Sequence, residues 1–297
     1  MLDRFLDPAV LAGISSLDLV AKTVVDGFVN GMHRSPDFGF SQEFAEYRAY
    51  TPGDDLRHVD WNLFARTERA YLKRYRGETN SQLTVLLDAS NSMKFTSHAV
   101  TKMDYARYTA ASLFYLAIKN QRDPAGLIVF DDEVRDYIRP STRQGQLYRL
   151  MAGLEGAEPA ARTNFAKPLL HFQQLLHRRG IVLVISDFYE SPETIVKTIE
   201  PLRFHGSEVV LFHILDPKEI FPDMRGGPAI LVDLETEQKL EVIPDYVKVQ
   251  YRRKMDDHLE QLRDRTRAAG MGYHLLMTDK PVDAALTEYL SLRGGRN

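Results

Sequence analysis

Five short apolar runs predict buried β-strands. Each is rich in branched side chains and closes on an aspartate, at residues 83–88, 125–131, 181–187, 208–216 and 273–279. Runs of this length are typical of strands that are covered on both faces. Stretches with helical spacing lie between most of them, at residues 103–119, 165–177, 192–202 and 246–268. This alternation predicts an α/β fold with a doubly wound, mostly parallel sheet of the Rossmann-like kind.

Two segments depart from this alternation. Residues 134–139 follow Asp131-Asp132-Glu133 too closely for a crossover connection, so we expect them to fold back as an antiparallel edge strand. Residues 229–243 predict a second hairpin.

The first 80 residues do not join the alternation either. Residues 9–29 are apolar but are interrupted by Asp18, Lys22 and Asp26. Each of these charges would cost about 2.5–3.5 kcal/mol at the centre of a bilayer, so we expect an amphipathic helix and not a membrane span. Residues 31–62 are rich in Gly, Pro, Phe and charge. We therefore predict an added N-terminal helical and irregular region over residues 1–80 and an α/β domain over residues 81–297.

The predicted topology brings two of the aspartates together. Right-handed crossovers in a doubly wound sheet favour pairing of the first strand, 83–88, with the strand 181–187. Asp88 and Asp187 would then face each other at the carboxyl edge, where the strand order reverses and ligands usually bind. We interpret Asp131, Asp216 and Asp279, which close the other runs, as caps and loop anchors.

A cluster of short oxygen-bearing side chains follows the first strand. The residues Asp88-Ala89-Ser90-Asn91-Ser92 form a D-x-S-x-S loop. Hydroxyl and carboxylate oxygens suit Mg²⁺, which prefers octahedral oxygen coordination and keeps several waters. The alternative is that Asp88 and Ser90 only cap the next turn. The motif, its strand and the opposing Asp187 together favour a metal site.

This loop resembles the metal-ion-dependent adhesion site of the von Willebrand factor type A fold, which uses D-x-S-x-S, then a Thr, then an Asp. The resemblance implies that Ser90, Ser92 and Thr163 bind Mg²⁺ (or Mn²⁺ or Ca²⁺) directly, that Asp88 and Asp187 hold its waters, and that a partner carboxylate fills the remaining position. The family's glycines before that Thr are replaced here by Ala160-Ala161-Arg162, so Ser141 and Thr142 remain alternatives to Thr163.

A second pattern precedes this loop: Glu43-Phe44, Arg48-Ala49-Tyr50, Pro52-Gly53-Asp54-Asp55-Leu56-Arg57, Val59-Asp60-Trp61 and Leu72-Lys73-Arg74-Tyr75. It resembles the bacterial family called domain of unknown function fifty-eight, and with the adhesion-type site the likeness covers residues 30–290. It implies a cytoplasmic protein with a von Willebrand-type core that works beside a MoxR-type AAA+ ATPase.

Charged residues in the N-terminal region have simpler interpretations. Residues 52–55 have the chemistry of a tight turn, and we interpret the charges around it as a network that pins this region to the core. Those charges are Arg48, Asp54, Asp55, Arg57 and Asp60, with Trp61 as the apolar anchor. Basic residues and tyrosines alternate over residues 66–76, which we interpret as a solvated edge strand and not as a nucleic-acid surface.

Composition narrows the class of protein. Hydrophobic residues make up 44% and charged residues 27%, as in ordinary globular proteins, and the net charge of −3 argues against a main task of coating nucleic acid. The chain has no cysteine, which excludes disulfides, thiolate metal sites and a cysteine nucleophile. The start lacks the pattern of a secretory signal, so we expect a cytoplasmic location.

The leading functional hypothesis is a non-enzymatic, metal-dependent protein-interaction module whose partner is a MoxR-type AAA+ ATPase or its client. The first alternative is a Mg²⁺-dependent phosphatase or phosphoryl-transfer enzyme with Asp88 as nucleophile. Haloacid dehalogenase-like enzymes carry a second Asp two positions later, however, and this chain has Ser90 there. Walker, G-x-S-x-G and G-x-G-x-x-G motifs are absent, and no histidine looks catalytic. The second alternative is a metal-independent scaffold.

Overall fold

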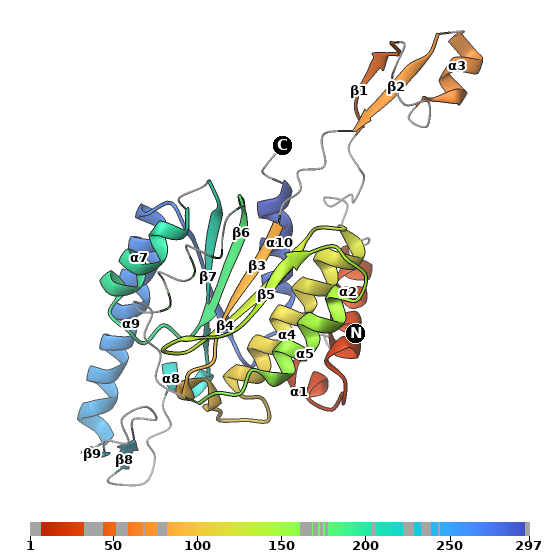
Figure 1. Ribbon diagram of the computed structural model, residues 1–297. Helices are drawn as coiled ribbons and strands as arrows, with labels where there is room; N and C mark the ends of the chain where they lie inside the picture. The colour runs from red at the N-terminus through yellow and green to blue at the C-terminus, as the bar shows by residue number, and fades with distance from the viewer. Residues whose placement is uncertain are drawn as a thin grey trace.

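A six-stranded sheet forms the centre of the computed structural model (Figure 1). The structure describes residues 7–32, 44–51, 59–67, 69–75, 82–160, 168, 172, 175, 178–203, 206–221, 229–232, 239–242 and 244–294. The strand order is β10-β7-β6-β3-β4-β5. The strands are β3 (Gln82–Asp88), β4 (Ala125–Phe130), β5 (Val134–Ser141), β6 (Gly180–Ser186), β7 (Glu208–Leu215) and β10 (Gly272–Met277). The predicted α/β fold with a mostly parallel sheet is confirmed.

The register confirms the predicted topology. β3 pairs in parallel with β4 on one side and with β6 on the other. Leu83 therefore lies opposite both Ala125 and Ile181. β5 pairs with β4 in the antiparallel direction, as expected for the edge strand. The strand order reverses beside β3, so the loops after β3 and β6 leave the same edge of the sheet next to each other.

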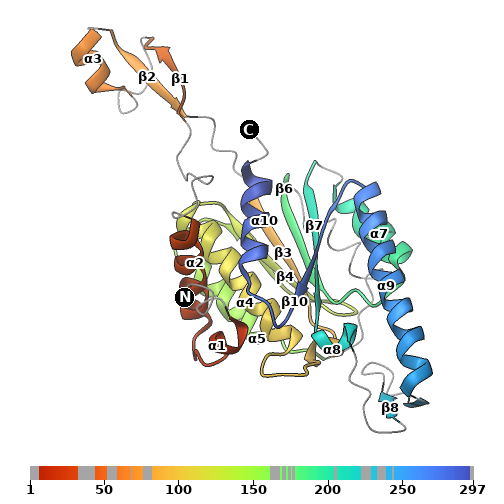
Figure 2. The ribbon, with the colours of Figure 1, turned by 180° about the vertical axis from the view of Figure 1, so that it is seen from behind.

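Helices cover both faces of the sheet (Figures 1 and 2). One face carries α2 (Leu17–Met32), α4 (Lys102–Tyr115), α5 (Gln146–Gly156) and α10 (Asp283–Gly294). A π-helical segment, η4 (Leu116–Asn120), extends α4. The other face carries α7 (Pro192–Ile199), the 3₁₀ segment η5 (Glu200–Arg203) and the long helix α9 (Pro244–Ala268). Because both faces are covered, the four central strands β3, β4, β6 and β7 are buried along almost their whole length instead of alternating.

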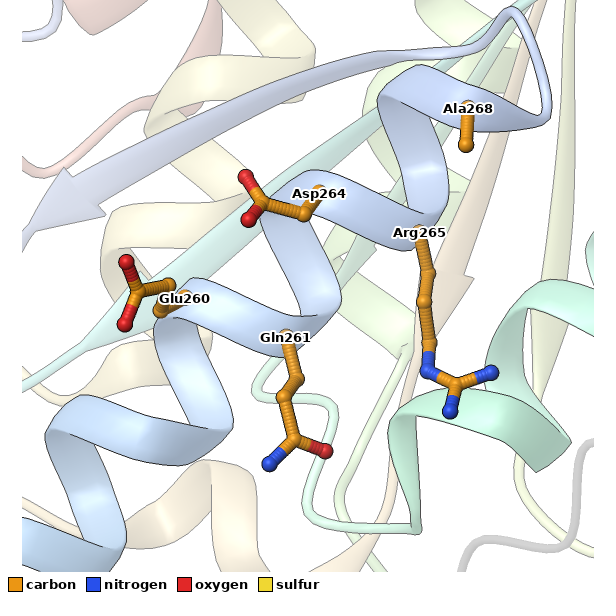
Figure 3. A pocket seen from close by; sticks show the side chains of 5 residues that line it. All are labelled: Glu260, Gln261, Asp264, Arg265 and Ala268. Carbon is orange, nitrogen blue, oxygen red and sulfur yellow. The ribbon is translucent and has the colours of Figure 1, made fainter.

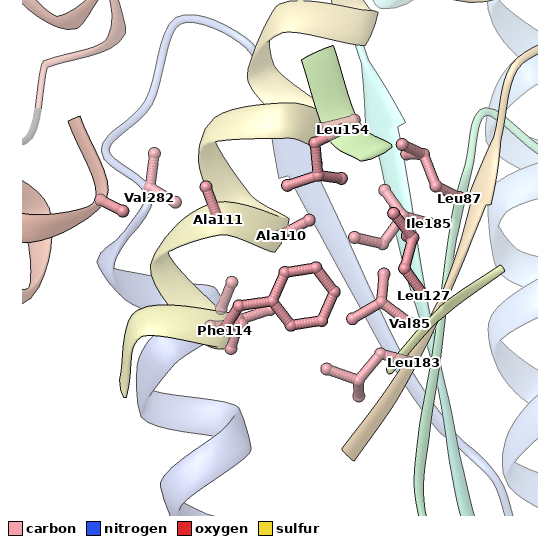
Figure 4. Packing of buried hydrophobic residues seen from close by; sticks show 14 of the residues in the cluster. Val85, Leu87, Ala110, Ala111, Phe114, Leu127, Leu154, Leu183, Ile185 and Val282 are labelled. Atoms are coloured by element: carbon pink, nitrogen blue, oxygen red, sulfur yellow. The ribbon is translucent and has the colours of Figure 1, made fainter. Parts of the chain in front are cut away.

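Two apolar layers pack against the two faces. Successive β3 residues point in opposite directions, so Val85 and Leu87 belong to one cluster and Leu86 to the other. Figure 4 shows Ala110 and Phe114 of α4 facing the strand residues of the first cluster. The small side chain of Ala110 brings the helix close, and the ring of Phe114 fills the space beside it. α4 is thereby fixed against the centre of the sheet.

The N-terminal helix belongs to this same layer. A short helix, α1 (Pro8–Leu11), precedes α2. Val20, Val24 and Phe28 of α2 are buried in the cluster that contains α4, which confirms the predicted amphipathic helix. In the part of the chain that the structure describes, no helix has the length and apolar character needed to cross a membrane. The boundary near residue 80 remains a prediction, and the packing of α2 ties the helical start to the α/β core.

Two antiparallel hairpins complete the described elements. β1 (Phe44–Ala49) pairs with β2 (Tyr71–Tyr75), and α3 (Trp61–Thr67) lies between them in sequence. β8 (Ala229–Val232) pairs with β9 (Lys239–Val242), which confirms the hairpin predicted there. The predicted turn at 52–55, most of the predicted helix at 165–177 and the charges of Arg48, Asp54, Asp55 and Arg57 lie outside what the structure describes.

The expectation that Trp61 is an apolar anchor is wrong. Its side chain is 58% exposed and makes an edge-to-face contact with Phe64, itself exposed on the same short helix. The buried residue is instead Asp60, whose carboxylate caps the start of α3 by accepting from the Leu63 amide. The capping bond fixes Asp60 inward, and Trp61, the first residue of α3, faces solvent.

Candidate functional site

Asp88 lies fully buried at the carboxyl end of β3 and is held from two sides. Its Oδ1 accepts a hydrogen bond from the Ser90 amide at 2.8 Å, and its Oδ2 accepts one from the Ser186 hydroxyl at 2.6 Å. Ser186 is the last residue of β6, and its Oγ also accepts from the Phe188 amide. Ser186 therefore joins the two strand ends and fixes the direction of the Asp88 carboxylate.

The two serines of the D-x-S-x-S loop come together beside Asp88. Ser90 precedes a short 3₁₀ segment, η3 (Asn91–Lys94), and Ser92 lies within it. The tight turn brings the two hydroxyl oxygens to 3.0 Å from each other, and both side chains are buried. The capping alternative holds for Asp88, which accepts from the Ser90 amide, but the Ser90 hydroxyl makes no capping bond.

Thr163 lies outside the described residues. The segment leading to it is anchored, because the Ala160 amide donates to the Ala89 carbonyl at 3.1 Å. Thr163 is three positions after Ala160, and three residues of extended chain span at most about 11 Å. The alternatives Ser141 and Thr142 do not meet Asp88. Ser141 pairs with Ala125 at the start of β4, which is the opposite edge of the sheet, because β5 runs antiparallel.

Asp187 follows β6 at the same edge as Asp88, as predicted, but it already has a cationic partner. The Lys102 Nζ lies 2.7 Å from Asp187 Oδ2 and 2.6 Å from Glu219 Oε1. Lys102 is the first residue of α4, and Glu219 belongs to the short helix α8 (Pro217–Ile220) after β7. Three elements that are distant in sequence therefore meet in one buried ion cluster.

Burial and charge oppose each other at Lys102, which is 0% exposed. Burial alone would lower the pKa of the ammonium, but the carboxylates of Asp187 and Glu219 outweigh it and raise the pKa above its usual value. Burial also raises the pKa of Glu219, and the ammonium offsets that effect only in part. A helix N-terminus disfavours a cation, so the two carboxylates are what keep Lys102 in place.

Aromatic rings complete the surroundings of Lys102. Its ammonium lies 4.8 Å from the ring centre of Tyr189 and 5.8 Å from that of Phe95. The Tyr189 hydroxyl donates to Glu219 Oε1, while the residue as a whole is 47% exposed. Tyr189 therefore covers the ion cluster and presents its other side to solvent.

The remaining strand-end aspartates act as expected at two positions. Asp216 caps α8 and also accepts from the amide and hydroxyl of Ser97, which ties down the chain after η3. Asp131 accepts from the Arg135 side chain and the Glu133 amide in the turn between β4 and β5. These contacts confirm both as caps or loop anchors.

A second cluster of buried polar side chains contains His213 and contacts Phe188, the residue after Asp187. Phe188 has a positive φ of 47°, a strained conformation for a residue with a large side chain. Its carbonyl lies 2.9 Å from His258 Nε2, and its ring packs on the His213 ring. His213 Nδ1 lies 2.8 Å from the Tyr273 hydroxyl. Burial, the His258 ring and the Lys102 ammonium lower the pKa of His213 to about 3, so its imidazole is neutral at pH 7.

The described donor set fits a hard divalent cation in part. Ser90 and Ser92 supply two adjacent hydroxyls, and Asp88 supplies a carboxylate beside them. Asp187 is the exception, because one of its oxygens is bound to an ammonium. No group of three or more His, Asp or Glu side chains suited to a metal occurs in the described part of the chain, at this site or away from it.

Sequence reasoning missed Lys102, Ser186 and Glu219. Ser186 directly precedes Asp187 in the sequence. The predicted pairing of strands 83–88 and 181–187 could therefore have placed Ser186 near Asp88. A lysine in the first turn of a helix is typically a surface residue, so Lys102 gave no sign of burial. No local pattern connects Lys102 to Glu219, which is 117 positions away.

A shallow hollow on the outer side of α9 is separate from this edge (Figure 3). It is lined by Glu260, Gln261, Asp264, Arg265 and Ala268, all from one helix. This end of α9 leads into the start of β10, at the amino edge of the sheet. The hollow therefore adds nothing to the Asp88 site.

We expect Ser186→Ala to destabilise the protein, because it removes a buried bond to Asp88 and one from the Phe188 amide. The expected loss of unfolding free energy is about 1–3 kcal/mol, measured by urea denaturation. Ser112→Ala is the matched control: it removes a buried hydroxyl that only bonds back to the Tyr108 carbonyl in its own helix, and should cost under about 1 kcal/mol. Equal losses in both variants would contradict the bridging role.

Acid should destabilise the protein through His213. The unfolded imidazole takes a proton below about pH 6.5, while the folded one stays neutral until about pH 3. Stability present at pH 7 is therefore lost as the pH falls below about 6.5, by about 2 kcal/mol at pH 5 from this group. Urea denaturation at pH 7 and pH 5 should show a smaller loss for His213→Gln than for the wild type. Equal losses would show that His213 does not carry this pH dependence.

One solved structure agrees with this architecture. An aerotolerance-related membrane protein from Bacteroides fragilis superposes with a TM-score of 0.50 at 13% identity, over 72% of this chain and 99% of that one. A von Willebrand factor type A structure from Catenulispora acidiphila is similar with a TM-score of 0.42 at 12% identity, over 72% of this chain and 42% of that one.

Sequence comparison gives the family. The uncharacterized protein Rv1480 of Mycobacterium tuberculosis is 26% identical over 293 residues, which cover 97% of this chain and 90% of that protein. The uncharacterized protein Mb1516 of Mycobacterium bovis matches over the same shares of both chains. The profile of a family described as protein of unknown function DUF58 matches residues 46–263, more than half of the chain. The chain therefore belongs to the DUF58 family.

Proposed function

We propose that this protein is a non-enzymatic interaction module that binds a carboxylate of a partner protein through a divalent cation at the carboxyl edge of its sheet. In this proposal the hydroxyls of Ser90, Ser92 and Thr163 hold Mg²⁺, or Mn²⁺ or Ca²⁺, and Asp88 and Asp187 bind its waters. The cation supplies an open coordination position for the partner's carboxylate. The protein chain orients the ligands through the hydrogen bonds that hold Asp88.

One observation carries the proposal most strongly. The Ser90 and Ser92 hydroxyls lie 3.0 Å apart and beside a carboxylate that two other residues hold in position. A pair of buried hydroxyls that faces a fixed carboxylate is an arrangement of hard oxygen donors. The bond from the Ala160 amide to the Ala89 carbonyl supports a role for Thr163, because it places Ala160, three positions before Thr163, beside the loop.

The phosphatase alternative has weaker support. A carboxylate nucleophile needs a free oxygen to attack the phosphorus of a bound substrate, but both oxygens of Asp88 accept hydrogen bonds. The position of the usual general acid is Ser90, whose hydroxyl lies against Ser92. Neither group is placed for phosphoryl transfer.

The partner is named from the family resemblance. We propose a MoxR-type AAA+ ATPase, or a client that such an ATPase remodels, as the protein whose carboxylate is bound, with the interaction taking place in the cytoplasm. The exposed side of Tyr189, next to Asp187, offers an apolar contact beside the proposed cation. Aromatic rings of this kind often anchor protein interfaces.

Partner capture in the presence and absence of the metal tests this function. Tagged wild-type protein is incubated with native lysate in Mg²⁺ or in chelator, and bound proteins are identified by mass spectrometry. We expect a partner that is lost on chelation, which removes the cation, and lost with Asp88→Asn/Ser90→Ala, which removes one direct ligand and one carboxylate that holds its waters. Asn at position 88 keeps one acceptor oxygen and the shape of the side chain, which protects the fold.

Asp257→Ala serves as the control, since this aspartate is exposed on α9. It should keep the same partner in Mg²⁺. Metal-independent capture that survives the double substitution would contradict the proposal and favour the scaffold alternative. Mg²⁺-dependent hydrolysis of a generic phosphoester that Asp88→Asn abolishes would favour the phosphatase.

A further inference from the structure

We infer that Lys102 is a built-in competitor of the divalent cation for Asp187, and that Glu219 is the reserve counter-ion that keeps Lys102 when Asp187 turns to the metal. This inference rests on the proposed function and names the residues that regulate the same site. Lys102 thereby sets the metal affinity of the site without being one of its ligands.

Two carboxylates share one ammonium. Lys102 Nζ lies within 2.7 Å of an oxygen of Asp187 and within 2.6 Å of an oxygen of Glu219. Both are full-strength, charge-assisted bonds. Either carboxylate alone can therefore act as a counter-ion for the ammonium, and loss of one does not leave a buried charge without a partner.

The two carboxylates have different neighbours. Glu219 has two further partners of its own: its Oε2 accepts from the Asp216 amide, and its Oε1 accepts from the Tyr189 hydroxyl. Asp187 follows β6, whose last residue, Ser186, bonds directly to Asp88. Asp187 is therefore bound to the ammonium and directly follows the residue that bonds to Asp88, whereas the side-chain partners of Glu219 are Lys102, Asp216 and Tyr189.

The charge of Lys102 opposes the binding of a second cation at Asp187. A divalent cation that draws on Asp187 must weaken the Lys102–Asp187 pair, and the two cations also repel each other across a buried region where charges are poorly screened. Lys102 therefore makes metal binding weaker than the oxygen donors alone would allow. Its hold on Glu219 and the rings of Tyr189 and Phe95 provides a place for the ammonium after the exchange.

Two single substitutions should move the metal affinity in opposite directions. Lys102→Met keeps a long, flexible side chain but removes the competitor, so the dissociation constant for Mn²⁺ should fall by about tenfold or more. Glu219→Gln removes the reserve counter-ion and leaves the ammonium on Asp187, so that constant should rise by a similar factor. Isothermal titration calorimetry with MnCl₂ measures both. Thermal melts with and without MnCl₂ check that each variant is folded.

The double variant Lys102→Met/Glu219→Gln separates competition from simple charge. It has the same net charge as the wild type and leaves no unpaired ammonium, which also protects the fold, yet Asp187 is free. Competition predicts that it binds Mn²⁺ about tenfold more tightly than the wild type. If net charge alone controlled affinity, the double variant would match the wild type, and the inference would be wrong.

A further variant separates this inference from the proposed function. Ser90→Ala removes a direct ligand and should abolish Mn²⁺ binding in the wild-type and Lys102→Met backgrounds. Loss of binding with Ser90→Ala but no change with Lys102→Met would overturn the role of Lys102 and leave the metal site standing. Binding that survives Ser90→Ala, or no binding in any variant, would overturn the metal site, and the role of Lys102 with it.

Discussion

The buried ammonium of Lys102 holds three parts of the fold at the carboxyl edge of the sheet. It joins the start of α4 to the loop after β6 and to α8 after β7 through two carboxylates. Removing the ammonium, or both carboxylates together, would leave unpaired charge in a buried region, which is strongly unfavourable. The position of Asp187, and with it the outer side of the candidate site, depends on this cluster.

The core determines where that ammonium can lie. α4 packs through Ala110 and Phe114 on the centre of the sheet, so its first residue reaches the edge where β3 and β6 end. The same parallel pairing that buries Val85 and Leu87 brings Asp88 and Ser186 into hydrogen-bonding distance. Apolar packing thus sets the geometry of the polar site, and the polar contacts then fix individual side-chain directions.

Much of the fold could be predicted from the sequence because buried parallel strands leave continuous apolar runs. Those runs gave the strands, their pairing at β3 and β6, and the shared edge of Asp88 and Asp187. Local pattern failed where tertiary contacts decide. Trp61 looked like an anchor but faces solvent, and Ser141 is turned to the far edge by the antiparallel β5. Lys102 and Glu219 carry no local signal, because only the fold brings them together.

The most direct test of this account is a crystal structure of the protein grown with MnCl₂, in which anomalous scattering locates the manganese. The account predicts a peak within coordination distance of the Ser90 and Ser92 hydroxyls, with the Lys102 ammonium bound to Glu219 and withdrawn from Asp187. A structure with no manganese at this loop, or with manganese there and the Lys102–Asp187 pair unchanged at its present 2.7 Å, would contradict it.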